Sequence, residues 1–165
     1  MADADSCEAR RPLFELLGEL ATVDSFFGHV SDDVQWTMVG RHPLAGKYRN
    51  KKDFLDGTLE QVRSRSGGLC FRLKQMYGTS SFVTVVMEGV ATATDGRPYD
   101  PFYVWLCRFE GDTIVEVQAY VDTMVVTDLI DRVPSGDEAA KEAPANAQAE
   151  ARRTAVPGPL QLERP

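Results

Sequence analysis

Apolar side chains recur at helical spacing in the first third of the chain and alternate with polar ones through most of the remainder. The spacing predicts a helix over residues 10–21, a short second helix over 23–27 and a third helix from residue 50 to 63. The apolar face of the third helix consists of Phe54, Leu55, Thr58, Leu59 and Val62.

Alternation with β-branched and aromatic residues predicts strands over 34–39, 69–77 and 82–94, followed by two long strands within 99–123. Asp95-Gly96 and Glu110-Gly111-Asp112 are the signals for the tight turns between the last three of them. Helices followed by a run of antiparallel hairpins predict an α+β domain. We expect a curved antiparallel sheet with the N-terminal helices on its concave face, enclosing one pocket.

The composition changes at both ends of this pattern. Residues 1–9 are small, polar and acidic, which predicts a flexible N-terminus. Residues 134–165 are rich in proline, alanine and charge and contain no aromatic residue, so we expect a disordered tail. The pocket domain is therefore expected over residues 10–133.

The net charge and the cysteine residues limit the classes of partner and metal site that we expect. A net charge of −7 argues against a nucleic-acid partner. Only residues 41–52 are locally basic, and this stretch is either a solvated loop or an anion-binding site. No run of about eighteen apolar residues occurs, so we expect no membrane partner and a cytoplasmic location. Cys7, Cys70 and Cys107 are far apart in the sequence and lack the spacing of a metal site. Cys70 and Cys107 lie in strand-like runs, which predicts that these two are buried thiols.

Two segments carry a family resemblance. DVQWTMVGRHPLAGKYRNKKDFL and EGVATATDGRPYDPFYVWLCRFEGDTIVEVQAYVDT resemble the SnoaL-like branch of the nuclear-transport-factor-two-like superfamily over about residues 14–130. The resemblance implies a cone-shaped fold around one deep pocket, and frequent dimers. The superfamily contains ketosteroid isomerases, polyketide cyclases, limonene-epoxide-hydrolase-like enzymes and pockets with no known reaction, so fold alone does not give the function.

The catalytic residues of two of these groups are not kept. In the alignment that the resemblance implies, the oxyanion-binding acid of the ketosteroid isomerases falls on Trp105, and their general base falls on or beside Trp36. For the limonene-epoxide-hydrolase-like enzymes, one aspartate falls close to Glu88, but the second falls on Ala119 and the arginine near Val86. Neither mechanism is therefore expected.

The same alignment, combined with strand alternation, predicts the residues of the pocket. Glu88 faces either an apolar cavity, where its pKa would rise to suit a general acid or base, or solvent. His42 lies in the loop at the pocket rim, as a proton carrier or as an ordinary loop histidine. The expected substrate-binding residues are Trp36, Phe26, Phe54, Val86, Val90, Tyr103, Trp105, Val117, Ala119 and Val121.

Two classes of function remain open. The first is a cofactor-independent isomerase or cyclase of a hydrophobic, carbonyl-bearing substrate, polyketide- or terpenoid-like, with Glu88 as the acid/base. The second is a non-catalytic binding protein for an apolar small molecule. In either case the apolar outer face of the hairpin, with Phe102, Val104 and Leu106 beside Tyr120, predicts a homodimer.

Overall fold

The computed structural model describes residues 6–138, and over them the α+β prediction is confirmed. One curved, unclosed sheet has the strand order β2-β1-β7-β6-β4-β3, and a short strand β5 also pairs with β4. The strands are β1 (Val30–Val39), β2 (Gly46–Tyr48), β3 (Cys70–Gly78), β4 (Phe82–Thr92), β5 (Pro98–Tyr99), β6 (Phe102–Glu110) and β7 (Thr113–Val121). The helical elements are η1 (Cys7–Arg10), α1 (Arg11–Glu15), η2 (Leu16–Gly18), α2 (Val23–Phe27), α3 (Lys51–Phe54), η3 (Leu55–Leu59), α4 (Glu60–Arg63) and α5 (Thr123–Arg132).

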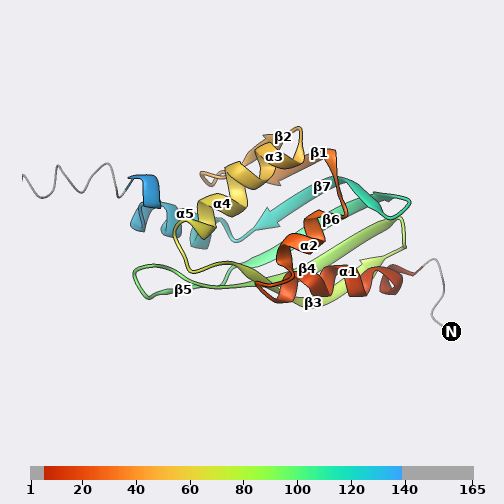
Figure 1. Cartoon of the computed structure of the whole chain (residues 1–165), viewed down its shortest axis with the longest axis horizontal. Coiled ribbons are helices and arrows are strands. Elements are labelled where there is room, and N and C mark those ends of the chain that lie inside the picture. Colours follow the sequence, from red (N-terminus) through yellow and green to blue (C-terminus); the bar gives the residue numbers. More distant parts are fainter. Residues whose placement is uncertain (1–5, 139–165) are drawn as a thin grey trace, which may run out of the picture. The chain divides into compact units, whose positions relative to one another are not determined.

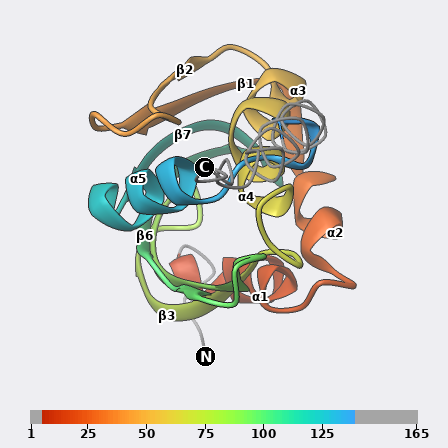
Figure 2. The ribbon, with the colours of Figure 1, turned by 90° about the vertical axis from the view of Figure 1, so that its left-hand side faces the viewer.

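The helices gather on one face of the sheet, as Figures 1 and 2 show. The sheet is not purely antiparallel, and in this respect the prediction was wrong. β1 pairs with β7 in parallel, with Trp36 opposite Val117 and Met38 opposite Ala119. The chain between these two strands crosses over through helices and other strands, so that β7 runs beside β1 in the same direction.

The predicted helix over 50–63 is one helical segment made of α3, η3 and α4. Asn50 caps it by accepting a 2.7 Å hydrogen bond from the Asp53 amide. Its middle turn, η3, is a π-helix, a form often found at functional sites. The backbone of Gly57 in this turn lies directly against Tyr48. A Cβ at position 57 would be 2.5 Å from the Tyr48 ring, so a larger residue would not fit there.

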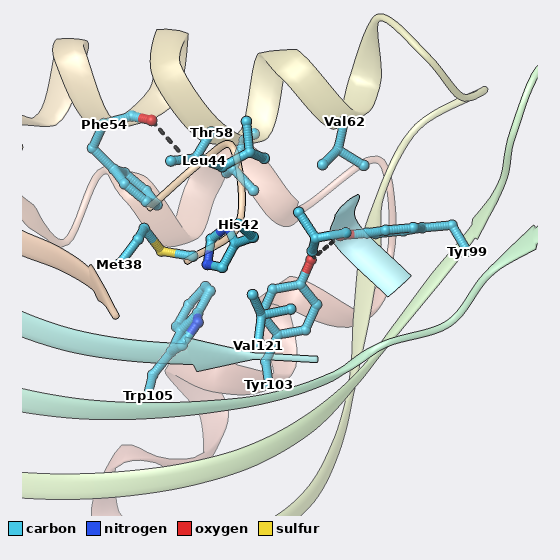
Figure 3. Close-up of a pocket in the computed structure, with 12 residues that line it drawn as sticks. Met38, His42, Leu44, Phe54, Thr58, Val62, Tyr99, Tyr103, Trp105 and Val121 are labelled. Atoms are coloured by element: carbon cyan, nitrogen blue, oxygen red, sulfur yellow. Dashed lines mark hydrogen bonds between the residues drawn. The ribbon is translucent and has the colours of Figure 1, made fainter. Parts of the chain in front are cut away.

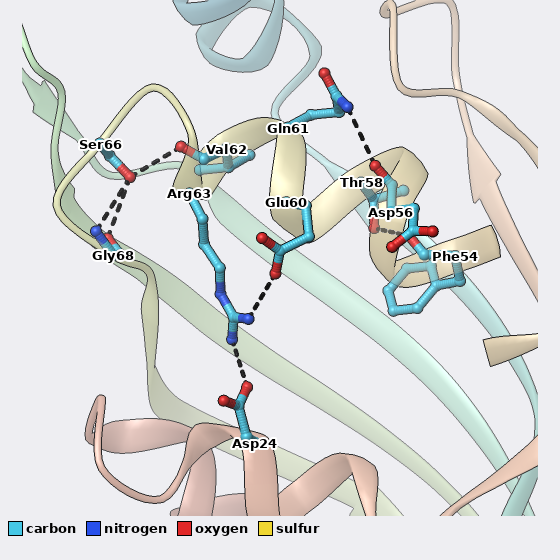
Figure 4. A network of polar contacts seen from close by, with 10 residues as sticks. All are labelled: Asp24, Phe54, Asp56, Thr58, Glu60, Gln61, Val62, Arg63, Ser66 and Gly68. Atoms are coloured by element: carbon cyan, nitrogen blue, oxygen red, sulfur yellow. Dashed lines mark hydrogen bonds and ion pairs between the residues drawn. The ribbon is translucent and has the colours of Figure 1, made fainter. Parts of the chain in front are cut away.

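Arg63 joins the end of this segment to α2. Its guanidinium donates to Asp24 at 2.8 Å and to Glu60 at 2.8 Å, as Figure 4 shows. Thr58, one turn above, donates its hydroxyl proton to the Phe54 carbonyl at 2.7 Å. The ion pair of Arg63 with Asp24 thus ties this segment to α2.

The last helix, α5, begins at Asp122, whose carboxylate accepts from the amides of Met124 and Val125. Its residues Val126 and Leu129 are buried in the core. No helix among residues 6–138 is long and apolar enough to cross a membrane.

The structure separates a compact unit that ends at Val133 from one that begins at Pro134. Residues 6–9, which the sequence placed in a flexible N-terminus, belong to the folded unit, since Cys7 is buried and Ser6 bridges Thr79. Most of the predicted disordered tail, residues 139–165, lies outside the described residues.

Candidate functional site

The helices and the concave face of the sheet enclose a small apolar cavity, drawn in Figure 3. It leaves about 20 Å³ for the centre of a water molecule, which is room for roughly one water. Its lining residues are Met38, His42, Leu44, Phe54, Thr58, Leu59, Val62, Tyr99, Tyr103, Trp105, Val121 and Val126.

Three elements supply most of this lining. Strand β6 presents Tyr103 and Trp105 on its buried face, because alternate side chains of a strand share one face. The segment α3–α4 presents the apolar stripe that includes Phe54 and Val62. The loop after β1, residues 40–45, contributes His42 and Leu44.

This loop is bounded by glycines. Gly40 and Gly46 have φ values of 133° and 156°, which side chains with a Cβ rarely adopt. Between them the side chains of His42 and Leu44 are buried, while Arg41 and Pro43 are exposed. The Leu44 carbonyl accepts from the Tyr48 hydroxyl at 3.0 Å. The loop therefore forms the wall of the cavity that faces solvent on its other side.

His42 is the most unusual group in the site. It is only 4% exposed, and its ring nitrogens make no well-formed hydrogen bond among the described residues, although the Val39 backbone lies within reach of the ring. Burial lowers the pKa of its imidazole, and the nearby Val39 backbone opposes this only in part. Figure 3 shows the ring between Leu44 and Trp105, and it is neutral at physiological pH.

Tyr99 and Tyr103 form a buried pair of phenols. Their hydroxyl oxygens lie 2.8 Å apart, so that one donates to the other. Burial raises the pKa of both hydroxyls, and both stay protonated. The pair holds two protons and makes one internal hydrogen bond, which leaves one hydroxyl proton for a ligand.

The two tryptophans also carry unpaired polar atoms. The indole nitrogens of Trp36 and Trp105 are buried without a hydrogen-bond partner among the described residues. Trp36 stacks on Phe54 with ring centroids 3.7 Å apart and meets Trp105 edge to face at 5.0 Å. Trp105 lines the cavity, whereas Trp36 lies behind Phe54 in the aromatic core.

The prediction that Glu88 faces the pocket was wrong. Val85 and Met87 are buried on the inner face of β4, whereas the alternate residues Val86 and Glu88 are only half-buried and lie on the outer face. On the outer face the Glu88 carboxylate lies 3.1 Å from Lys74 and 3.1 Å from Arg72. Hydrogen bonding to Lys74, aided by Arg72, lowers the pKa of Glu88, the opposite of what a neutral general acid needs.

Val86 and Val90 share the outer face with Glu88 and do not line the cavity either, so the prediction was wrong for them too. The physical reason is the side-chain period of two, by which an error of one residue in register moves a whole strand to the opposite face.

The other predicted pocket residues divide into two groups. Those that line the cavity are His42, Phe54, Tyr103, Trp105 and Val121. Those that are buried nearby but do not line it are Phe26, Trp36, Val117 and Ala119.

Several residues that line the cavity were not predicted to do so, although strand alternation and the apolar helix stripe place them on the correct face. Met38 shares a face of β1 with Trp36, and Thr58, Leu59 and Val62 lie on the predicted helix stripe with Phe54. Tyr99 carried no such signal, because it reaches the cavity from the short strand β5. Within residues 6–138 no cluster of His, Cys, Asp or Glu has the arrangement of a metal site.

Comparison with known proteins gives relatives of this fold. The chain is 29% identical over 101 residues to the dimerizing cyclase phiC of a fungal species, covering 58% of this chain and 45% of that protein. The chain thus spans less than half the length of this curated relative. No protein-family model matches the sequence.

Two solved structures illustrate the fold match. An NTF2-like protein from Burkholderia thailandensis aligns with a TM-score of 0.62 at 16% identity, over 76% of this chain and 97% of that one. TerC, co-crystallized with polyporic acid, aligns with a TM-score of 0.58 at 18% identity, over 75% of this chain and 96% of that one.

These matches show that the chain has the fold of the NTF2-like proteins, a curved sheet with helices packed against it. The curated relative, which shares 29% identity with this chain, is named a cyclase.

Proposed function

We propose that the chain is a cofactor-independent cyclase or isomerase of a hydrophobic, carbonyl-bearing substrate, with His42 as the general base. The observation that carries this proposal is the buried, neutral imidazole of His42 with both nitrogens unpaired. A buried polar group without a partner costs about 1–3 kcal/mol, so its presence in the cavity calls for a role with a ligand.

The groups around the cavity suit proton abstraction next to a carbonyl. The unprotonated nitrogen of His42 takes a proton from the carbon beside the carbonyl, and the resulting enolate oxygen accepts a hydrogen bond from the free hydroxyl of the Tyr99–Tyr103 pair. The enolate carbon can then attack the carbon of a second carbonyl group, whose oxygen takes the proton from His42 as the ring closes. Alternatively, the enolate takes the proton back from His42 at another carbon, which completes an isomerisation.

The cavity has room for only about one water, far less than any such substrate needs, so binding must move part of its wall. The loop 40–45 is the wall best placed to move, because positive-φ glycines lie at both of its ends and the side chains of Arg41 and Pro43 face solvent. Its movement carries His42, so entry of the substrate and placement of the base are coupled.

The relatives support this class of reaction without naming the substrate. The curated relative is named a dimerizing cyclase, and the neutral cavity suits polyketide- or terpenoid-like molecules. The cytoplasmic location expected from the sequence remains a prediction.

The test is exchange of the carbon-bound protons of an enolisable ketone, 2-tetralone, in D₂O, followed by NMR. We expect the protein to accelerate exchange and His42→Asn to reduce the rate by at least about 100-fold, the smaller end of what a positioned general base contributes. Glu88→Gln is the matched control, and its rate should equal that of the parent chain because Glu88 lies on the outer face.

Quenching of tryptophan fluorescence measures binding separately, since both tryptophans lie in or beside the cavity wall. Binding without His42-dependent exchange would favour the second function, a non-catalytic carrier of an apolar ligand. Exchange that survives His42→Asn and disappears in Glu88→Gln would refute the role of His42.

A further inference from the structure

The cavity contains more hydrogen-bond donors than it can satisfy. The indole N–H of Trp105 has no acceptor among the described residues, and one proton of the Tyr99–Tyr103 pair is unused. The lining includes no carboxylate. Thr58 uses its proton on the Phe54 carbonyl and offers only lone pairs.

The excess of hydrogen-bond donors over acceptors indicates which kind of ligand fits the cavity. A ligand ammonium or a hydrocarbon would leave these donors unpaired, whereas each acceptor oxygen that reaches one of them restores a hydrogen bond. A free carboxylate would need a cation to offset its own desolvation, and the lining contains no Lys or Arg. An uncharged ligand with several carbonyl-type oxygens is the complement that remains.

The placement of two donors sets how these oxygens are arranged. Tyr103 and Trp105 are alternate residues on the buried face of β6, so their Cα atoms lie about 7 Å apart along the strand. Their ring centroids are 6.4 Å apart. Trp105 is 2% exposed and Tyr103 5% exposed, so bulk water does not compete for either donor. One ring that carries two carbonyl oxygens can therefore meet both donors.

We propose that the pocket selects a ligand with two ring carbonyl oxygens, such as a cyclic diketone, quinone or anhydride, one bound by the Trp105 indole N–H and the other by the free hydroxyl of the Tyr99–Tyr103 pair. This inference names the ligand class of the proposed catalytic pocket and rests on that pocket being a binding site. It does not depend on catalysis by His42.

The test uses three ligands of nearly the same shape, 2,2-dimethyl-1,3-indandione, 2,2-dimethyl-1-indanone and 2,2-dimethylindane, titrated by calorimetry into the full chain. They carry two, one and no carbonyl groups, and none of them can enolise, so only binding is measured. We expect affinity to rise by about three- to tenfold with each carbonyl, the equivalent of one net hydrogen bond.

Two variants locate the effect. Trp105→Phe should bind the diketone and the monoketone with the same affinity, because one of the two donors is gone. The matched control is Trp36→Phe, which removes an equally buried indole that does not line the cavity and should keep the preference.

NMR of ¹⁵N-labelled parent protein gives a second measurement, which does not depend on ligand binding by a variant. The chain has two tryptophans and therefore two indole N–H signals, which Trp36→Phe assigns. The Trp105 proton signal should move downfield with the diketone and not with the hydrocarbon, while the Trp36 signal moves little.

Equal affinity for the three ligands, no binding of any of them, or a Trp105 signal that the diketone leaves in place would overturn the inference. A diketone preference without His42-dependent exchange of 2-tetralone would uphold the inference and refute the proposed catalysis. The reverse result would uphold catalysis and refute this ligand class.

Discussion

Replacing His42 by leucine should stabilise the protein, although most core substitutions destabilise. The imidazole is buried with two nitrogens that make no hydrogen bond, and leucine has a similar volume and no polar atom. Relief of this desolvation is worth about 1–3 kcal/mol, and some of it is lost because leucine does not match the shape of the imidazole. We expect a net gain of about 1–2 kcal/mol in the free energy of unfolding.

The gain is measured by urea unfolding followed through tryptophan fluorescence, with the m-value checked for a change in the unfolded state. The corresponding rise in Tm is roughly 4–8 °C for a domain of this size. His29→Leu is the matched control, because His29, the other histidine of the chain, is exposed and its replacement should change the free energy by less than about 0.5 kcal/mol.

A loss of stability above about 1 kcal/mol in His42→Leu would refute the reasoning, since it would mean that the imidazole makes polar contacts worth more than its burial costs. The expected combination of higher stability and lost proton exchange is the pattern of a residue kept for function at the expense of stability.

Three further predictions follow from the same structure. Because burial lowers the pKa of His42, its imidazole binds a proton more readily in the unfolded chain than in the folded one. The stability of the parent should therefore fall as pH drops below about 6.5, more steeply than that of His42→Leu. An equal fall in Tm of both proteins between pH 7 and pH 5 would argue against this. The outer face of the hairpin, where Phe102 and Tyr120 are exposed, should form a homodimer that Phe102→Asp disrupts, and light scattering that finds a monomer of the parent at micromolar concentration contradicts this. Removal of residues 134–165 should leave Tm nearly unchanged, since the compact unit ends at Val133, and a fall of more than about 5 °C would mean that the removed residues stabilise it.

Hydrophobic patterning predicted most of the fold because it reports which face of each element is buried. The helix stripe at Phe54, Thr58 and Val62 and the alternation at Tyr103 and Trp105 both became cavity wall. The parallel pairing of β1 with β7 could not be predicted in this way, since alternation along a strand is the same for either direction of its neighbour.

The error at Glu88 has a local cause in the turn before β5. A two-residue turn at Asp95-Gly96 would place Glu88 opposite Tyr103 and therefore inside. The structure instead has a three-residue loop, in which the Ala93 amide donates to the Arg97 carbonyl at 2.9 Å and Gly96 adopts a φ of 87°. This loop pairs Glu88 with Phe102 on the outer face.

The length of this turn therefore determines which side chains of β4 lie on the inner face of the sheet. The dipeptide Asp-Gly is compatible with both loops, so the sequence signal for a turn was correct while the register it implied was not. His42 was identified from the sequence, but its burial depends on the loop between Gly40 and Gly46, which no periodic pattern describes.

The pairing of β1 with β7 has a consequence for how the protein is made. Met38 and His42 are synthesised early, but the β1–β2 hairpin pairs with the main sheet only through β7, which ends at Val121. At about 5–20 residues per second the ribosome takes several seconds to add the residues between them. During that time Trp36 and Met38 of β1 lack the strand that they pair with, so the nascent chain exposes apolar surface that is later buried in the core and the cavity wall. A chaperone that binds such surface would act before residue 121 is added.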